Sequence, residues 1–310
     1  MPMINPEIRF VENSDIDHER WDQCVANSPF GIVYGYSWYL DRICPHWDAL
    51  VWGNYLYIMP LVNNSKLGIR YVYQPFFTQQ LGVFSNFLPE PDIVNQFLHA
   101  IPERFRLTDM NLNLGNTPTI SSFKISQNTT FHLELHQSLT GIRSLYNANT
   151  RRNIQKAVQN KVFISQVYDI PMFLKFTQIN LKDKSPEVKS KHYQALQKVI
   201  SYALYTQLGE IYGAFDSGNN LIAAVFFVGS NQKVIYLAAS SNTRGTEQSA
   251  MFLLIDTFIQ NNIGKNLMLD FEGSNIPGVA RFYSGFGALP QRYYSVHQNK
   301  LPNLLRLIKK

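Results

Sequence analysis

Apolar positions in the first half of the chain alternate between strand-like and helix-like spacing. The stretch IRFVE alternates apolar and polar residues as a half-buried strand does, and the following DIDHERWDQCVANS has helical spacing that ends before Pro29. A second helix is predicted in YSWYLDRIC, and the β-rich segment from Ala49 to Ser85 predicts an antiparallel meander with a turn at NNSKLG. A helix in PDIVNQFLHAIPERF, broken at Pro102, and a strand in FKISQNTTFHLEL complete one α/β layer structure.

The second half shows the same two kinds of spacing. SLTGIRSLYNANTRRNIQKAVQNKV predicts two helical pieces with a cap near Ala148, and KHYQALQKVISYALYTQL predicts a helix with one buried face. Three strands are expected in EIYGAF, LIAAVFFVG and VIYLAAS, separated by the turns DSGNN and SNQ. GTEQSAMFLLIDTFIQNN then predicts a helix, LMLDFEG a strand, PGVARFYSGFG a short helix and RYYSVHQ a last strand. FISQVYDIPMFLKFTQI repeats the strand-then-helix order of the N-terminus, which hints at a duplicated fold.

Size and composition fit two globular domains. The chain has 310 residues, 45% of them hydrophobic and 16% charged. We place the domains at residues 1–139 and 140–310. The cysteines, Cys24 and Cys44, are too few to staple such a chain, and neither a secretory leader nor a membrane span is visible. We therefore expect a cytoplasmic protein.

Charge is distributed unevenly between the halves. Residues 1–140 hold 8 Lys and Arg against 13 Asp and Glu, whereas the rest of the chain holds 20 against 9. The segment from Gly141 to Lys161 has five basic residues and no acidic one. Such a field attracts phosphate-bearing partners, whether a nucleotide, a coenzyme or RNA. A solvated lysine surface is the alternative for the cluster from Lys175 to Lys198.

Three stretches carry a resemblance to a known family: TRRNIQKAVQNKV, SSNTRGTEQSAMFLLIDTFI and DFEGSNIPGVARFYSGFGA. The second half resembles a Gcn5-related N-acyltransferase (GNAT) domain. The whole chain resembles the FemAB/FemX-like peptidoglycan aminoacyltransferases and the BioF2-like acetyltransferases, because YGYSWYLDRI and YQPFFTQQLGV are similar to segments of their first domain.

The resemblance implies an α+β protein of two tandem GNAT-like domains, each a mixed, mostly antiparallel sheet flanked by helices, the first of them degenerate. It implies an N-acyltransferase that moves an acyl or aminoacyl group from a thioester of coenzyme A or an ester of tRNA to an amine. The acceptor would be a small molecule or a peptidoglycan precursor. No covalently bound cofactor, DNA partner or metal is implied. The resemblance also implies that the last residues of the chain pack back on the first domain.

Amine acylation needs a group that positions the amine and a group that protonates the leaving thiol or hydroxyl. The two-residue period of LMLDFEG places Asp270 and Glu272 on one face of a strand, opposite Leu269 and Phe271. These carboxylates could position the amine. They could equally cap the next helix or pair with Arg281.

Tyr283 is the predicted proton donor. It lies four residues before Gly287, the spacing at which the resemblance to GNAT enzymes implies the tyrosine that protonates a thiolate. The FemX-like enzymes have a lysine here, so the tyrosine favours thioester chemistry slightly. Arg281 and Tyr283 point about 200° apart around a helix, so both cannot line one narrow pocket. A core position for the aromatic ring is the alternative.

The loop SSNTRGTEQSA is where a coenzyme A enzyme would bind pyrophosphate. Arg244, Gly245 and Ser249 are the candidate contacts there, although the expected glycine pattern is broken and Glu247 would repel phosphate. This weakens the coenzyme A hypothesis.

Further substrate contacts are predicted in two places. Arg151, Arg152, Lys156 and Arg281 would bind phosphate or carboxylate. Arg152 and Lys156 are four residues apart on a predicted helix and are therefore neighbours on one of its faces. In the first half, Gln74 and Gln79 suit a sugar or peptide, or else satisfy backbone groups.

The histidines have no ligand spacing in a helix, so no metal site is assigned. A non-catalytic binding protein for a sugar nucleotide or peptide, and an RNA-binding module, remain the alternatives to an enzyme.

Overall fold

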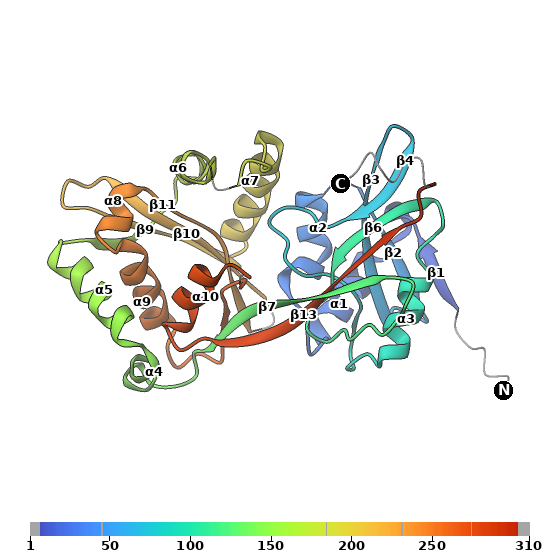
Figure 1. Ribbon diagram of the computed structural model, residues 1–310, viewed down its shortest axis with the longest axis horizontal. Coiled ribbons are helices and arrows are strands. Elements are labelled where there is room, and N and C mark those ends of the chain that lie inside the picture. The colour runs from blue at the N-terminus through green and yellow to red at the C-terminus, as the bar shows by residue number, and fades with distance from the viewer. Residues whose placement is uncertain (1–6, 45, 184, 231, 274, 303–310) are drawn as a thin grey trace. The chain divides into compact units, whose positions relative to one another are not determined.

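The computed structural model describes residues 7–44, 46–183, 185–230, 232–273 and 275–302. The chain divides into two compact units, which we call unit 1 (residues 1–128 and 292–310) and unit 2 (residues 129–291) (Figure 1). The division therefore falls inside a strand rather than between residues 139 and 140, and the chain returns to unit 1 at Arg292. Residues 303–310, the end of the basic tail, lie outside the described ranges. None of the helices described is long and apolar enough to cross a membrane.

Unit 1 is a sheet with helices packed on it. Its elements are β1 (Ile8–Val11), two short 3₁₀ turns (Asn13–Asp15 and Val33–Gly35), α1 (His18–Asn27), α2 (Ser37–Ile43), β2 (Trp47–Trp52), β3 (Tyr57–Lys66), β4 (Ile69–Tyr73), β5 (Phe84–Ser85), α3 (Pro91–His99), β6 (Phe105–Asn111), and parts of β7 (Lys124–Glu134) and β13 (Leu289–Asn299).

The strands of unit 1 follow the order β1-β2-β3-β4-β6-β13. Every pair is antiparallel except β4 with β6. Helix α1 is capped by the Asp17 side chain, which accepts a hydrogen bond from the Arg20 backbone N–H at 3.1 Å. The helix buries Trp21 against Trp47 of β2, with ring centroids 5.1 Å apart. This aromatic contact joins helix to sheet.

The turn between β3 and β4 lies within NNSKLG, as predicted, but occupies only its last two residues. Strand β3 runs through Asn63, Asn64 and Ser65, and the turn is made by Leu67 and Gly68, whose φ angles are +52° and +76°. Two consecutive residues with positive φ are typical of the tight hairpin turns that match the twist of the strands. The polar residues before them are therefore strand residues.

Unit 2 contains most of the helices. Its elements are α4 (Leu139–Leu145), α5 (Ala148–Gln159), β8 (Phe163–Gln166), α6 (Ile170–Leu181), α7 (Ser190–Tyr205), β9 (Gly209–Phe215), β10 (Leu221–Ser230), β11 (Lys233–Ser241), α8 (Thr243–Glu247), α9 (Ala250–Asn262), β12 (Met268–Asp270), α10 (Pro277–Ser284) and the second half of β7.

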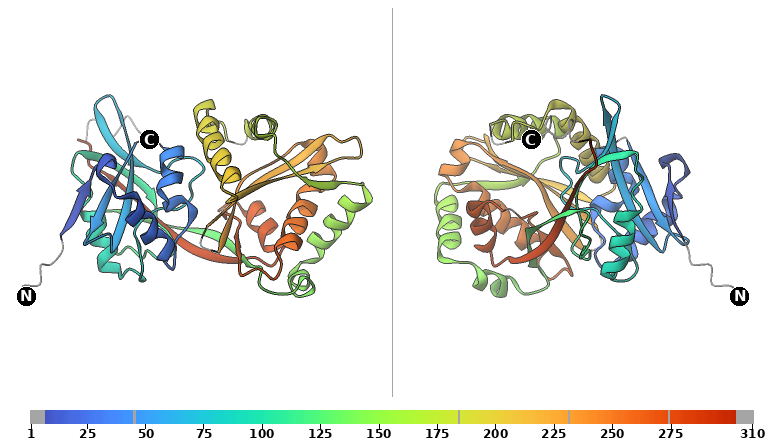
Figure 2. Two further views of the ribbon diagram at one scale, coloured as in Figure 1. Left: turned by 180° about the vertical axis from the view of Figure 1, so that it is seen from behind. Right: turned by 45° about the vertical axis from the view of Figure 1, so that its right-hand side comes forward.

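The sheet of unit 2 has the order β7-β12-β11-β10-β9-β8, with β11 and β12 as its parallel pair. One face carries α9 and α10, and the other carries α6 and α7 (Figure 1; Figure 2). Helix α9 packs on β9 and β10, where Phe258 stacks on Phe227 with centroids 3.7 Å apart. Both faces are thus covered, as the almost fully buried β10 requires.

Both units have the same order of elements. A strand, two helices and three antiparallel strands are followed by a helical crossover to a parallel strand: β1 to β6 in unit 1 and β8 to β12 in unit 2. In each unit the parallel strand then pairs antiparallel with a strand from elsewhere in the sequence, β13 beside β6 and β7 beside β12. The sequence hint of a duplicated fold is therefore confirmed.

Two elements of unit 2 are shorter than predicted. The helix expected from Gly245 to Asn262 is split into α8 and α9, because Ser249 has a left-handed backbone with φ of +59°. The strand expected through Gly273 ends at Asp270, since Glu272 and Gly273 have φ angles of +56° and +25° and turn the chain away. Both breaks bear on the predicted site.

Candidate active site

The parallel strands β11 and β12 separate at their carboxyl ends. They pair over three residues only, Lys233–Ile235 with Met268–Asp270, whereas β11 continues to Ser241. The chain after β12 leaves through Gly273, where a Cβ atom would lie 2.2 Å from the Cα of Thr130. Only glycine fits this close approach. A gap beyond the carboxyl ends of parallel strands is a common ligand position in α/β proteins.

Asp270 is the last residue of β12, at the point where the two strands separate, and is held in one orientation. Its side chain is only 2% exposed, and its Oδ1 accepts hydrogen bonds from Thr130 Oγ1 at 2.5 Å and from the backbone N–H of Glu272 at 2.8 Å. His132, directly opposite in the β7–β12 register, places Nε2 3.2 Å from Asp270 Oδ2. Two hydrogen bonds thus fix the carboxylate, and the His132 ring lies beside it without a hydrogen bond from Nε2.

Tyr283 lies on α10 with its ring enclosed by aromatic side chains. The ring stacks on Phe271 at 4.8 Å between centroids, with Tyr236 and Phe131 within 6.1 Å, and the residue is 9% exposed. Burial raises the pKa of the Tyr283 phenol above its ordinary value, and the nearby Glu272 and Asp270 charges raise it further. The phenol therefore keeps its proton at neutral pH.

Glu272 lies off the strand and next to the phenol. The residue as a whole is half-buried, yet its Oε1 is inaccessible to solvent, and burial raises the pKa of its carboxyl well above the ordinary value. Burial therefore favours the neutral acid, which cannot attract an ammonium ion. This opposes the predicted role of Glu272 in positioning an amine and leaves Asp270 for it.

The predicted catalytic residues lie on two faces of the opening. Leu269 and Phe271 point into the core beneath α9 and α10 that also contains Tyr283. Because side chains alternate along a strand, Asp270 and its partner His132 face the other way, as the two-residue period predicts.

An accessible cavity beside the phenol was expected, and the described cavities do not provide one. Neither Asp270 nor Tyr283 lines any of the three cavities, which are formed entirely by residues within the described ranges. In this conformation the Tyr283 ring is enclosed.

A groove of about 620 Å³ lies on the outer side of α10. It is lined by Asn147, Asn149, Phe252, Gly278, Arg281, Phe282 and Ser284. Phe252 and Phe282 form an edge-to-face pair with centroids 4.8 Å apart, and no carboxylate within the described ranges forms an ion pair with Arg281. Arg281 thus lines the groove and Tyr283 does not, which agrees with their predicted divergence.

The basic face of α5 continues from this groove. Asn149 lines the groove, and Arg152 and Lys156 follow at intervals of three and four residues along the same helix. These two side chains and Arg151 are exposed, and none forms an ion pair with another described residue; Arg151 donates a hydrogen bond to the Ser144 carbonyl at 3.1 Å. The three charges are therefore available to an anionic ligand.

The loop before α9 has its predicted phosphate contacts already in use. Arg244 Nε lies 2.9 Å from Oδ2 of Asp216, a fully buried side chain. The backbone N–H of Gly245 donates to the Asn242 side chain at 2.8 Å. Gly245 itself is needed because a Cβ atom would lie 2.0 Å from the Ile222 carbonyl oxygen. The loop thus stabilises its own fold rather than presenting free donors, which weakens the predicted cofactor site.

Ser249 and the glutamines of unit 1 also have local partners. Ser249 Oγ donates to Asn153 Oδ1 at 2.7 Å, which links α9 to α5. Gln74 Nε2 donates to the Thr78 carbonyl, and its Oε1 accepts from the Asn111 backbone N–H. Gln79 Oε1 accepts from the neighbouring Gln80 side chain. Gln74 therefore has the backbone-satisfying role that was the alternative to substrate binding.

Sequence reasoning missed the partners of Asp270. His132 was considered only as half of a metal pair, and Lys233 was not considered. Lys233 stands two residues before the one that pairs with Asp270, so both face the same side of the sheet. Burial lowers the pKa of Lys233, and the Asp270 charge opposes that shift. His132 and Lys233 are far from Asp270 in the sequence, and strand pairing over such distances leaves no pattern in the local sequence that would predict it. Within the described residues, no group of three or more His, Cys, Asp and Glu side chains could hold a metal.

Comparison with known proteins gives the fold a name. No family model matches the chain, and no curated protein matches its sequence. Among solved structures it is similar to FemX, with a TM-score of 0.66 and 10% identity over 95% of this chain and 99% of FemX. L-PGS from Bacillus licheniformis gives 0.54 and 10% over 94% of both chains. A tandem GNAT protein from the clavulanic acid biosynthesis pathway gives 0.53 and 11% over 96% of this chain and all of that one.

These similarities confirm the predicted fold. The chain is an α+β protein with the tandem GNAT fold of FemX and the GNAT protein, and each unit has one mixed, mostly antiparallel sheet. Identity near 10% establishes the fold alone.

Proposed function

We propose that this chain is an N-acyltransferase that acts in unit 2, at the opening between β11 and β12. The observation that supports it is the fixed Asp270–His132 pair on one face of the opening and the protonated Tyr283 phenol on the other. An amine acceptor would hydrogen-bond to Asp270 and attack the carbonyl carbon of the donor. The bond to the leaving group breaks as the new amide forms. His132 and Asp270 take the amine proton, and Tyr283 gives a proton to the leaving oxygen or sulfur.

The properties of Tyr283 favour an ester donor over a thioester. A thiol has a pKa of about 8.5 and leaves readily as a thiolate, which is too weak a base to draw a proton from a phenol of raised pKa. An alkoxide is a much stronger base and does need the proton. This reverses the slight preference for thioester chemistry that the tyrosine alone suggested.

Two other parts of unit 2, the loop before α9 and the exposed face of α5, support the same donor. The loop before α9 uses Arg244 and Gly245 internally, whereas Arg151, Arg152 and Lys156 of α5 have no acidic partner among the described residues. An unpaired cationic face that continues into a groove with an aromatic pair suits a nucleic acid end, with phosphates on α5 and a base against Phe282. We therefore propose aminoacyl-tRNA as the donor, as for a FemX-like enzyme, and an amine on a small molecule or cell-wall precursor as the acceptor.

Binding of tRNA tests the donor directly. The double variant R152E/K156E should weaken tRNA binding about 10-fold or more and reduce the salt dependence, because each lost phosphate contact removes released counterions. The matched control is K175E/K198E, which makes the same change of charge on exposed residues of α6 and α7. Equal loss in the two variants would show non-specific attraction and refute a site on α5.

Transfer itself is tested with a mixture of labelled aminoacyl-tRNAs and candidate amines, followed by mass spectrometry of the amide. Y283F keeps the aromatic ring and removes only the acid, so we expect normal folding and a loss of about 10²–10⁴-fold in turnover. H132Q should lower turnover, because the ring beside Asp270 is lost. Full activity in Y283F would refute its role as proton donor.

A non-catalytic RNA-binding protein is the second candidate, and the enclosed position of Tyr283 favours it. It would bind tRNA through α5 in the same way but release every amine unchanged.

A further inference from the structure

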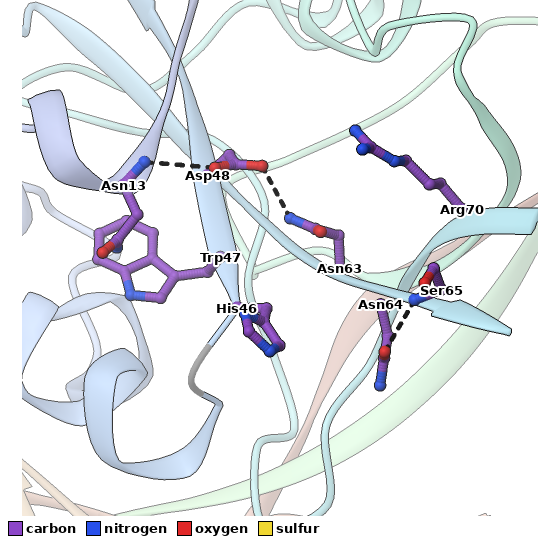
Figure 3. Close-up of a pocket in the computed structure, with 8 residues that line it drawn as sticks. All are labelled: Asn13, His46, Trp47, Asp48, Asn63, Asn64, Ser65 and Arg70. Carbon is purple, nitrogen blue, oxygen red and sulfur yellow. Dashed lines mark hydrogen bonds between the residues drawn. The ribbon is translucent and has the colours of Figure 1, made fainter. Parts of the chain in front are cut away.

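A polar cleft lies entirely within unit 1 and contains none of the residues of the candidate active site. It has a volume of about 330 Å³ and is formed where the ends of β2, β3 and β4 lie side by side (Figure 3). It is lined by Asn13, His46, Trp47, Asp48, Asn63, Asn64, Ser65 and Arg70. Seven of these eight side chains are polar.

Strand register brings the charged residues to one face. Asp48 pairs with Leu61 and Ser65 pairs with Arg70, and paired residues in antiparallel strands point the same way. Leu61 and Ser65 are four residues apart on β3, so they share a face. Asp48, Asn63, Ser65 and Arg70 therefore form one continuous polar surface over three strands.

The Asp48 side of the cleft is preorganised. Asp48 Oδ1 accepts a hydrogen bond from the Asn13 backbone N–H at 3.2 Å, and Oδ2 accepts one from Asn63 Nδ2 at 3.0 Å. Asn63 Nδ2 also lies 3.0 Å from the Leu61 carbonyl oxygen. These contacts fix the carboxylate before any ligand binds, which lowers the entropy cost of binding.

Arg70 faces this carboxylate from β4 without pairing with it. Its side chain extends from the strand toward the side of the cleft where Asp48 and Asn63 lie (Figure 3). Arg70 is exposed, and no carboxylate among the residues described lies within 4.0 Å of its guanidinium. The cleft thus presents one positive and one negative group that are held apart, with neutral hydrogen-bonding groups between them.

We propose that this cleft binds a small zwitterion of the α-amino acid class. The guanidinium of Arg70 binds the carboxylate, and Asp48 binds the ammonium group. A dianion such as phosphate would be repelled by Asp48, and a simple cation would be repelled by Arg70, whereas a zwitterion satisfies both. Ser65 and His46 are then available to polar atoms of the ligand side chain, and the volume suits a single amino acid or a dipeptide.

The experiment is isothermal titration of the full chain with a panel of free amino acids, each compared with its methyl ester and its N-acetyl derivative. We expect at least one amino acid to bind, and both of its derivatives to bind about 10-fold or more weakly, because each lacks one charge-assisted hydrogen bond. N-acetylglucosamine and inorganic phosphate serve as neutral and anionic probes.

Variants assign the charges to residues. R70Q should weaken the amino acid about 10-fold or more while leaving the methyl ester unchanged, and D48N should do the same for the N-acetyl derivative. R106Q is the matched control, since Arg106 is exposed on β6 of the same unit and does not line the cleft. Thermal unfolding of each variant shows whether it folds.

Three results would overturn the proposal: no amino acid binds, the neutral sugar or phosphate binds instead, or R106Q loses as much affinity as R70Q. Because binding is measured without turnover and the cleft contains no residue of the β11–β12 opening, failure here would leave the proposed transferase function untouched. Equally, an inactive transferase would leave the amino acid site intact.

Discussion

Two Arg–Asp pairs that differ in burial and in the number of contacts allow a direct test of what holds unit 2 together. Asp256 of α9, with its side chain 3% exposed, lies 2.5 Å from Arg143 Nη2 and accepts a second bond from Nε at 3.1 Å. Tyr146 also donates to it at 3.0 Å. In unit 1, Arg20 Nε lies 3.2 Å from Asp17 Oδ2, with the two side chains 55% and 44% exposed. The first pair joins α4 to α9, and the second lies within a single helix end.

The expected coupling energies follow from these contacts. Two charge-assisted hydrogen bonds would contribute about 3–6 kcal/mol in a fully buried site. The Arg143 side chain is 44% exposed, so solvent screening reduces this to about 2 kcal/mol. For the exposed Arg20–Asp17 pair we expect less than about 0.5 kcal/mol.

Double-mutant cycles with alanine measure both values by urea unfolding. The cycle cancels terms common to both backgrounds, including the loss of an acceptor for Tyr146 and the loss of the α1 cap at Asp17. All four tryptophans lie in unit 1, so fluorescence reports on the Arg20–Asp17 pair and far-ultraviolet circular dichroism reports on the Arg143–Asp256 pair. Equal coupling energies in the two pairs would refute the argument from burial.

Three further outcomes are expected. The pKa of Glu272 is raised in the folded state, so its contribution to stability is present below the ordinary pKa of 4.5 and is lost as pH rises through the folded-state pKa. E272Q should therefore become more stable than the wild type as pH rises. Urea unfolding at several pH values measures this difference. G245A should lose about 1–3 kcal/mol in thermal unfolding, since its new methyl group would meet the Ile222 carbonyl oxygen at 2.0 Å, and wild-type stability would contradict the packing described. Cys24 and Cys44 should react with iodoacetamide only after unfolding, because both are buried and burial raises the pKa of Cys24 to about 12; labelling of the folded protein would contradict this.

Local patterns account for much of the fold. The cap predicted near Ala148 is made by Asn147, whose side chain accepts from the Thr150 N–H at 2.8 Å. The turn predicted at DSGNN is closed by Asp216, whose Oδ1 accepts from the Gly218 and Asn220 N–H groups. Both interactions join residues within four positions, so the sequence displays them directly.

Interactions between distant strands and loops are what the sequence could not reveal. The alternation in LMLDFEG correctly places Asp270 opposite Leu269, but it does not say that His132 of another strand lies beside it. The sequence predicts that Arg244 of α8 can bind phosphate, because it does not reveal that Asp216, in the turn between β9 and β10, pairs with it. A residue type and its spacing limit what a side chain can do, and the tertiary partner decides which of those roles is left.

The unit 1 cleft shows how the same limitation hides a candidate site completely. Asn63, Asn64 and Ser65 are typical turn formers, and a turn at this point would have carried them away from the sheet into solvent. The positive φ angles of Leu67 and Gly68 move the turn beyond them, so β3 continues and alternation brings Asn63 and Ser65 to the same face as Asp48 and Arg70. A shift of the turn by one residue would reverse these faces, since the period of a strand is two. The amino acid cleft therefore depends on where this hairpin turns, which neither propensity nor hydrophobic pattern determines when a strand ends in polar residues.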